Sequence, residues 1–155
     1  MRAAAEIRYQ ILAIQREGNR RATQALKIAG ITPSQAEVLG LLRDFGTMSL
    51  KNLGELLVCE SGDSPSRLIE RLVKKGLVMK TRASSDRRGI SIYLSTEGLA
   101  IAESLVLAVD ESLENFVTNT LTETEIIESL KILRKLSHGL NANDGIKKRF
   151  SLEFN

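Results

Sequence analysis

The stretch that decides the fold is SPSRLIERLVKKG at residues 64–76. It opens with a helix start, because Ser64 can cap a helix and Pro65 fits the first helical position. Apolar residues at 68, 69, 72 and 73 then recur at helical spacing, and Gly76 ends the pattern. Serine, arginine and lysine occupy the opposite face. The stretch therefore predicts an amphipathic helix with a basic polar face.

A β-hairpin is predicted directly after this helix. Residues 77–82 form its first strand, and residues 90–94 alternate apolar and polar side chains as its second. The polar loop between the strands contains Arg87 and Arg88. The window 60–88 holds eight basic and four acidic residues, a net charge of +4, whereas the rest of the chain has −1. A basic excess confined to one short window is typical of a nucleic-acid contact.

This order of elements suits double-stranded DNA. A helix fits the major groove, where side chains near its N-terminal end reach base edges, and arginines on a hairpin can reach a narrow minor groove. A solvated charged surface explains the helix alone equally well, but helix and hairpin together favour DNA. We predict these DNA-binding residues: Ser49, Ser64, Ser66, Arg67, Arg71, Lys74, Arg87 and Arg88.

Further helices are predicted on both sides of this region. A long one covers about 3–29, a second begins with a capping box at Thr32 and ends at Gly46, and Ser49 caps a short third. Downstream, one long helix covers about 96–118 and the last runs from Thr122 to about Leu140. The first helix is long enough to need cover from outside its own domain. The tail at 146–154 reads as an extended arm on a neighbouring chain or as a disordered terminus.

Composition sets the limits on function. The chain has 155 residues, 43% of them hydrophobic, which suits one globular domain that is mainly α with a small β-hairpin. No apolar run approaches the ~18 residues of a membrane span, and the N-terminus lacks an apolar signal core, so we expect a cytoplasmic protein without a membrane partner. One cysteine and one histidine disfavour an enzyme, a metal site and a cofactor.

The chain resembles the MarR family of winged helix-turn-helix transcriptional regulators over about residues 8–140. Residues 32–42 are similar to the start of that family's DNA-binding part, and residues 68–78 to its recognition helix and the entry to its wing. Asp86-Arg87-Arg88 followed by Leu94-Ser95-Thr96-Glu97-Gly98 resembles its wing signature and the next helix start. The turn at 58–63 departs from the pattern, because it is about one residue longer and carries two acidic residues.

The resemblance implies a homodimer on a pseudo-palindromic operator, with recognition helices roughly 34 Å apart. It implies a winged helix-turn-helix lobe at 31–95 and a helical dimerisation lobe at 1–30 and 96–155, within one domain of 1–155. Arg87 and Arg88 would enter the minor groove, and Asp86 would orient an arginine. The family also suggests a repressor that a small-molecule effector releases. The dimer interface would include these apolar residues: Ile7, Ile11, Ile14, Leu130, Leu133 and Leu140.

Other interpretations remain open at the level of sequence. A winged helix can bind a protein partner instead of DNA, and the acidic residues Glu60, Asp63 and Glu70 fit that alternative. Cys59 suggests a redox sensor, but a lone cysteine is more often a small buried apolar residue, which we favour. His138 near a helix C-terminus fits a charge partner for the helix dipole.

Overall fold

The computed structural model describes residues 2–59, 62–82 and 89–152. Its strands are β1 (Met48–Ser49), β2 (Val78–Arg82) and β3 (Ile90–Leu94). A 3₁₀ turn at Lys27–Ala29 extends the first helix, and a π-helical turn at Ala102–Val106 joins the fifth to the sixth. The α-helices are α1 (Arg2–Leu26), α2 (Pro33–Phe45), α3 (Leu50–Leu56), α4 (Pro65–Lys74), α5 (Thr96–Ile101), α6 (Leu107–Thr120), α7 (Glu123–Ser137) and α8 (Asn141–Leu152). The mainly helical fold with a small β-hairpin is confirmed.

The predicted helix starts carry side-chain caps. At α2 the Thr32 hydroxyl accepts a hydrogen bond from Gln35 N at 3.2 Å, and the Gln35 side chain accepts one from Thr32 N at 3.1 Å. Such a cap contributes about 1 kcal/mol, so local sequence signals favour the points at which these helices begin. The other capping residues are Ser49, Ser64, Ser95 and Thr122.

The sheet is antiparallel in the order β1-β3-β2. The hairpin of β2 and β3 was predicted, and its register pairs Lys80 with Ile92. The additional strand β1 was not predicted, because two residues between helices show no alternation. Met48 of β1 lies opposite Ile92, so β3 is the central strand and its Ile92 side chain is fully buried.

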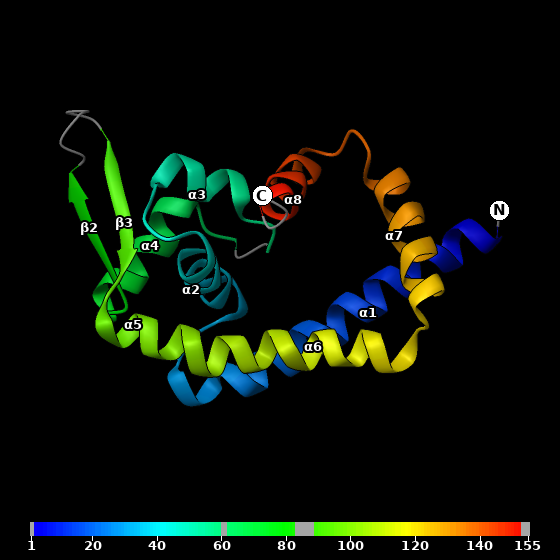
Figure 1. Cartoon of the computed structure of the whole chain (residues 1–155), viewed down its shortest axis with the longest axis horizontal. Coiled ribbons are helices and arrows are strands. Elements are labelled where there is room, and N and C mark those ends of the chain that lie inside the picture. Colours follow the sequence, from blue (N-terminus) through cyan, green and yellow to red (C-terminus); the bar gives the residue numbers. More distant parts are fainter. Residues whose placement is uncertain (1, 60–61, 83–88, 153–155) are drawn as a thin grey trace.

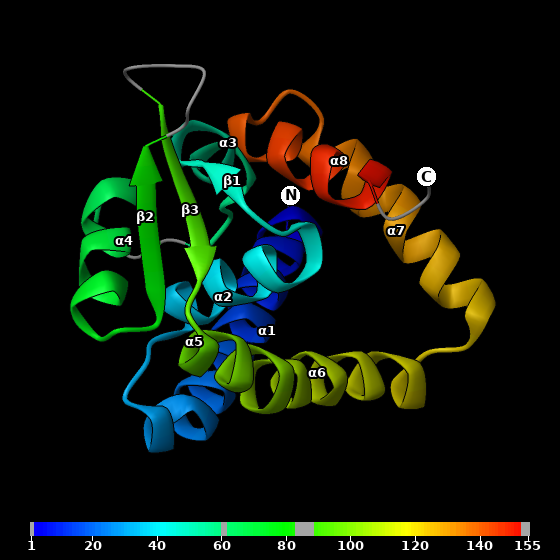
Figure 2. The ribbon, with the colours of Figure 1, turned by 60° about the vertical axis from the view of Figure 1, so that its left-hand side comes forward.

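The core lies where α2, α3, α4 and the sheet meet, with α2 near the centre in Figure 2. Three side chains of the predicted apolar face of α4, Leu68, Ile69 and Leu72, are buried there. Burial of a leucine or isoleucine side chain contributes about 1.5–3 kcal/mol, so this face holds α4 in place and leaves its polar face to solvent.

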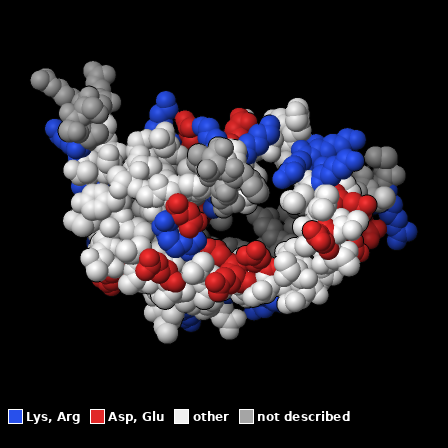
Figure 3. Space-filling model, in the orientation of Figure 1, with Lys and Arg blue, Asp and Glu red and all other residues white. Residues whose placement is uncertain are grey.

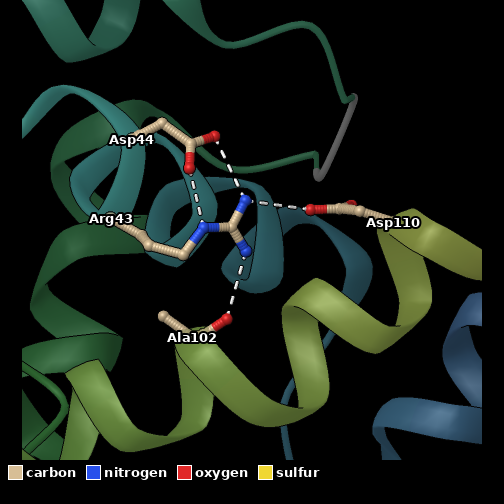
Figure 4. A network of polar contacts seen from close by, with 4 residues as sticks. All are labelled: Arg43, Asp44, Ala102 and Asp110. Atoms are coloured by element: carbon tan, nitrogen blue, oxygen red, sulfur yellow. Dashed lines mark hydrogen bonds and ion pairs between the residues drawn. The ribbon is translucent and has the colours of Figure 1, made fainter.

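The long helix predicted at 96–118 is present, but it contains the π-helical turn, which the sequence did not indicate. This turn packs against α2, where the guanidinium of Arg43 binds the Ala102 carbonyl oxygen at 3.1 Å. The same guanidinium contacts Asp44 at 2.7 Å and Asp110 at 3.2 Å (Figure 4). Arg43 therefore joins the end of α2 to the long helix at two places.

The remaining helices form an arch. In Figure 1, α5 and α6 run along the base, α1 crosses α6, and α7 turns back from its far end. The tail at 146–154 was expected to be an extended arm or disordered, and this expectation is wrong over 146–152, because residues 141–152 are helical. These residues form α8, which returns to the centre of the molecule and packs on α3.

Gly98 sits where α5 begins, against the backbone that follows α4. A Cβ atom on Gly98 would lie 1.9 Å from the Leu77 carbonyl oxygen, so no side chain fits. That carbonyl also accepts a hydrogen bond from Ser95 N at 3.1 Å, and the Ser95 hydroxyl donates one to the Gly76 carbonyl at 2.6 Å. The end of α4, the start of β2 and the start of α5 are therefore fixed to one another.

Gly98→Ala tests this contact. We expect the free energy of unfolding to fall by about 3 kcal/mol or more, because the obstructing atom belongs to the backbone and cannot rotate away. Gly18→Ala is the matched control, since a Cβ there meets nothing within 4 Å. It should leave stability unchanged or raise it by about 0.5–1 kcal/mol, as alanine does within helices. Urea unfolding of both variants measures the difference, and equal stability would contradict the close approach.

Candidate nucleic-acid interface

The polar face of α4 is the centre of the candidate interface. Ser64 caps the helix by accepting a hydrogen bond from Arg67 N at 3.4 Å, which leaves the helix N-terminus at the surface. The predicted contact residues on this helix are all exposed: Ser64, Ser66, Arg67, Arg71 and Lys74. A helix N-terminus with small hydroxyl side chains and arginines can bind phosphate and base edges together.

Acidic neighbours compensate part of this charge. Asp63, whose side chain is only 13% exposed, forms an ion pair with Arg71 at 2.8 Å. Glu70 pairs with Lys80 of β2 rather than with a lysine of its own helix. Within the described ranges, the side chains of Arg67 and Lys74 make no ion pair. Arg67 is therefore the arginine of α4 whose charge no described carboxylate neutralises.

Ser49, a predicted DNA contact, and Lys75, which follows α4, both make hydrogen bonds that stabilise the fold. Ser49 lies in β1 beside Ser91 of β3, and its hydroxyl caps α3 by accepting from Asn52 N at 3.1 Å. Lys75, just beyond α4, donates to the Gly30 carbonyl and to Gln35, which ties the end of α4 to the turn between α1 and α2. The Ser49 cap was predicted from the sequence, whereas the two Lys75 contacts could not be, because they join segments 45 and 40 residues apart.

The hairpin of β2 and β3 stands beside α4, and β2 packs on that helix. Lys80 and Arg82 of β2 are exposed and add basic charge to this side. The predicted wing residues Asp86, Arg87 and Arg88 lie outside the described residues. The first strand of the hairpin, β2, therefore carries exposed basic side chains, and Arg87 and Arg88 follow it in the sequence.

The long helices carry a different surface. In the view of Figure 3, acidic side chains gather along α6, whereas basic and acidic side chains alternate over α3 and α8. A row of carboxylates repels phosphate, so the face along α6 is unsuited to nucleic acid. The candidate interface is therefore assigned to the side of α4 and the hairpin, away from α6.

Exposed apolar residues mark α1 and α7 as incompletely covered. The predicted interface residues Ile7, Ile11 and Ile14 are 52%, 44% and 66% exposed. Leu130 and Leu133 of α7 are 43% and 49% exposed, and Leu140 in the turn to α8 is 58% exposed. An apolar groove of about 490 Å³ also runs between α1 and α6, lined by Ile14, Leu113 and Phe116 among others. Exposed apolar area on this scale is typical of an interaction surface.

The lone chemical residues do not form a reactive site. Cys59 is exposed, so the prediction of a buried apolar cysteine is wrong. Partial desolvation, with Glu37 nearby, raises the pKa of its thiol to about 11, which keeps it protonated and weakly nucleophilic at neutral pH.

His138 follows α7 as its C-terminal cap residue, near the helix end as predicted. In the part of the chain that the structure describes, no group of three metal-binding side chains occurs and no helix has the length and apolarity of a membrane span.

Comparisons with known proteins agree with this geometry. The MarR family profile matches residues 31–90. The transcriptional regulator SarZ of Staphylococcus epidermidis is 31% identical over 110 residues, which cover 70% of this chain and 73% of SarZ. The transcriptional repressor MdtR of Bacillus subtilis is 26% identical over 121 residues, 78% of this chain and 77% of MdtR. A mutant Escherichia coli MarR in complex with operator DNA matches with TM-score 0.72 and 27% identity, over 84% of this chain and 93% of that chain.

Proposed function

The chain belongs to the MarR family of DNA-binding transcriptional regulators, which are not enzymes, and we propose that it acts as a homodimeric repressor of a pseudo-palindromic operator. The observation that carries the proposal is α4 itself. Its apolar face is buried, its serine and arginine face is exposed, and a basic hairpin stands beside it. The operator complex of the E. coli relative supports DNA as the partner.

The DNA contacts are assigned by element. Arg67 and Arg71 of α4 bind base edges in the major groove, with Arg71 exchanging its Asp63 partner for DNA. Ser64, Ser66 and Lys74 bind phosphates around the same groove, and Ser49 binds the backbone beside it. Arg87 and Arg88 enter the minor groove, and Asp86 orients one of them. This assignment gives the α4 residues the specificity and the wing arginines much of the affinity.

Dimerisation uses the long helices. Residues 1–30 and 96–155 form the dimerisation lobe and residues 31–95 the DNA-binding lobe. The exposed isoleucines of α1 and leucines of α7, together with the groove between α1 and α6, support this division, because a second copy would remove their apolar area from water. In a two-fold dimer the same surface of each copy meets the other, and the two recognition helices reach successive turns of the duplex.

Effector release requires a connection between the two lobes. The guanidinium of Arg43 supplies one, since it holds both the Ala102 carbonyl and the Asp110 carboxylate of the long helix (Figure 4). A small molecule that favours a different setting of the long helices against α2 would move the recognition helices away from operator spacing. Such a molecule must bind that arrangement more tightly than the DNA-binding one.

The alternative, a winged helix that binds only proteins, rested on acidic residues near α4. Asp63 pairs with Arg71 and Glu70 pairs with Lys80, so each of these two carboxylates is bound to a basic side chain of the interface, while Glu60 lies outside the described residues. The alternative is therefore not favoured.

DNA binding is tested by measuring how duplex affinity depends on salt, in the wild type and in a variant without the wing arginines Arg87 and Arg88. Titration of duplexes from the DNA that flanks the gene, followed by fluorescence anisotropy at two salt concentrations, should show saturable binding to one fragment with a steep salt slope. Replacing both Arg87 and Arg88 by alanine should weaken binding by about a hundredfold and reduce the slope. Replacing Lys131 and Lys135 of α7 removes the same charge and should have little effect. Wild-type affinity and slope in the Arg87/Arg88 variant would refute the wing assignment.

Aspartate substitutions in α1 test the dimer. Ile11→Asp and Ile14→Asp place charge in the proposed interface, so sedimentation should show monomers, and operator affinity should fall with dimerisation. Ile28→Asp is the control, since Ile28 is 89% exposed beyond the end of α1. A dimer that survives both α1 substitutions at micromolar concentration would place the interface elsewhere.

A further inference from the structure

Glu37 of α2 is a buried carboxylate that joins three segments of the chain. Its side chain is only 5% exposed. One oxygen accepts a hydrogen bond from Val58 N at 2.8 Å, and the other accepts one from Cys59 N, also at 2.8 Å. The guanidinium of Arg149 donates to the carboxylate at 2.6 Å. A buried carboxylate needs both a charge partner and hydrogen-bond donors, and here α8 supplies the charge.

The segment that Glu37 holds leads toward the recognition helix. Val58 and Cys59 follow α3, whose last turn is closed by Leu57, and α4 begins at Pro65. Their N–H groups are where the chain leaves α3. Because the carboxylate binds both N–H groups, it fixes the direction in which the chain departs. Any movement of Glu37 therefore changes where the chain leaves α3.

Contacts other than the Glu37–Arg149 pair hold α8 against α3. Gly145 lies so close to α3 that a Cβ atom would be 2.5 Å from the Glu55 carbonyl oxygen. Lys148 forms an ion pair with the Glu55 side chain, and the buried Asn143 side chain accepts a hydrogen bond from the Ser137 hydroxyl at 3.2 Å. These contacts are independent of Glu37, and they place Arg149 beside it.

We propose that α8 is a positioning element for the recognition helix: Arg149, bound to Glu37, holds the turn between α3 and α4 in the setting that binds DNA. The inference rests on the proposed function for its effect on DNA. Without Arg149 the buried carboxylate loses its cationic partner, so it moves toward water and releases the N–H groups of Val58 and Cys59. Only residues 138–140 separate α7 from α8, so the same helix also connects the proposed dimer surface to the recognition helix.

The test combines operator affinity with amide hydrogen exchange at Val58 and Cys59 in the full chain. Arg149→Met keeps an unbranched apolar stem and removes the charge, and Gly145→Ala displaces α8 by a different route. Both should speed exchange at these two amides and weaken operator binding, each by about tenfold, which corresponds to ~1.4 kcal/mol. Arg149→Lys should retain most of both properties, because it keeps the charge.

A matched control separates this role from general destabilisation. Lys147→Met removes the same charge from the exposed side of α8 and should behave as wild type. Unchanged exchange in Arg149→Met, or faster exchange with unchanged operator affinity, would overturn the proposal. If the wild-type protein binds no duplex but Arg149→Met still exchanges faster at Val58 and Cys59, the proposed function is refuted. The role of Arg149 in holding these two amides is then supported.

Discussion

The contact between the Leu77 carbonyl oxygen and Gly98 is the constraint on which the arrangement depends. It occurs where three elements meet, because Leu77 follows α4 and precedes β2, while Gly98 lies in the first turn of α5. The hydrogen bonds of Ser95 to Gly76 and Leu77 hold the same junction. The helix α4, the β-hairpin and the long helix are therefore set at fixed angles to one another, which the proposed binding of two half-sites at a fixed spacing requires.

Local physical signals explain why most of the fold was predictable. Capping hydroxyls, a proline in the first turn and apolar residues at helical spacing act within a few residues of each other. The strand β1, the π-helical turn and α8 lacked such signals. The helix α8 contains Gly145 and three asparagine or aspartate residues, which are poor helix formers, so its helicity depends on packing against α3.

The candidate site likewise has features that the sequence predicted and features that it did not. The exposed face of α4 follows from the burial of Leu68, Ile69 and Leu72, which the sequence pattern indicated. The Asp63–Arg71 pair and the binding of Arg149 to Glu37 could not be predicted, because partners 8 and 112 residues apart become neighbours only in the folded chain. Cys59 was expected inside and lies at the surface, since the turn that carries it is held by backbone hydrogen bonds to Glu37 rather than by apolar packing.

The most direct test of the account is hydroxyl-radical footprinting of the purified protein on the duplex it binds best. A two-fold dimer that places α4 of each copy in the major groove predicts two protected patches related by symmetry, with centres about one duplex turn, roughly 34 Å, apart. Protection beside each patch should extend into the minor groove that the wing contacts. A single protected patch, or uniform weak protection along the duplex, would contradict the dimeric operator-binding arrangement.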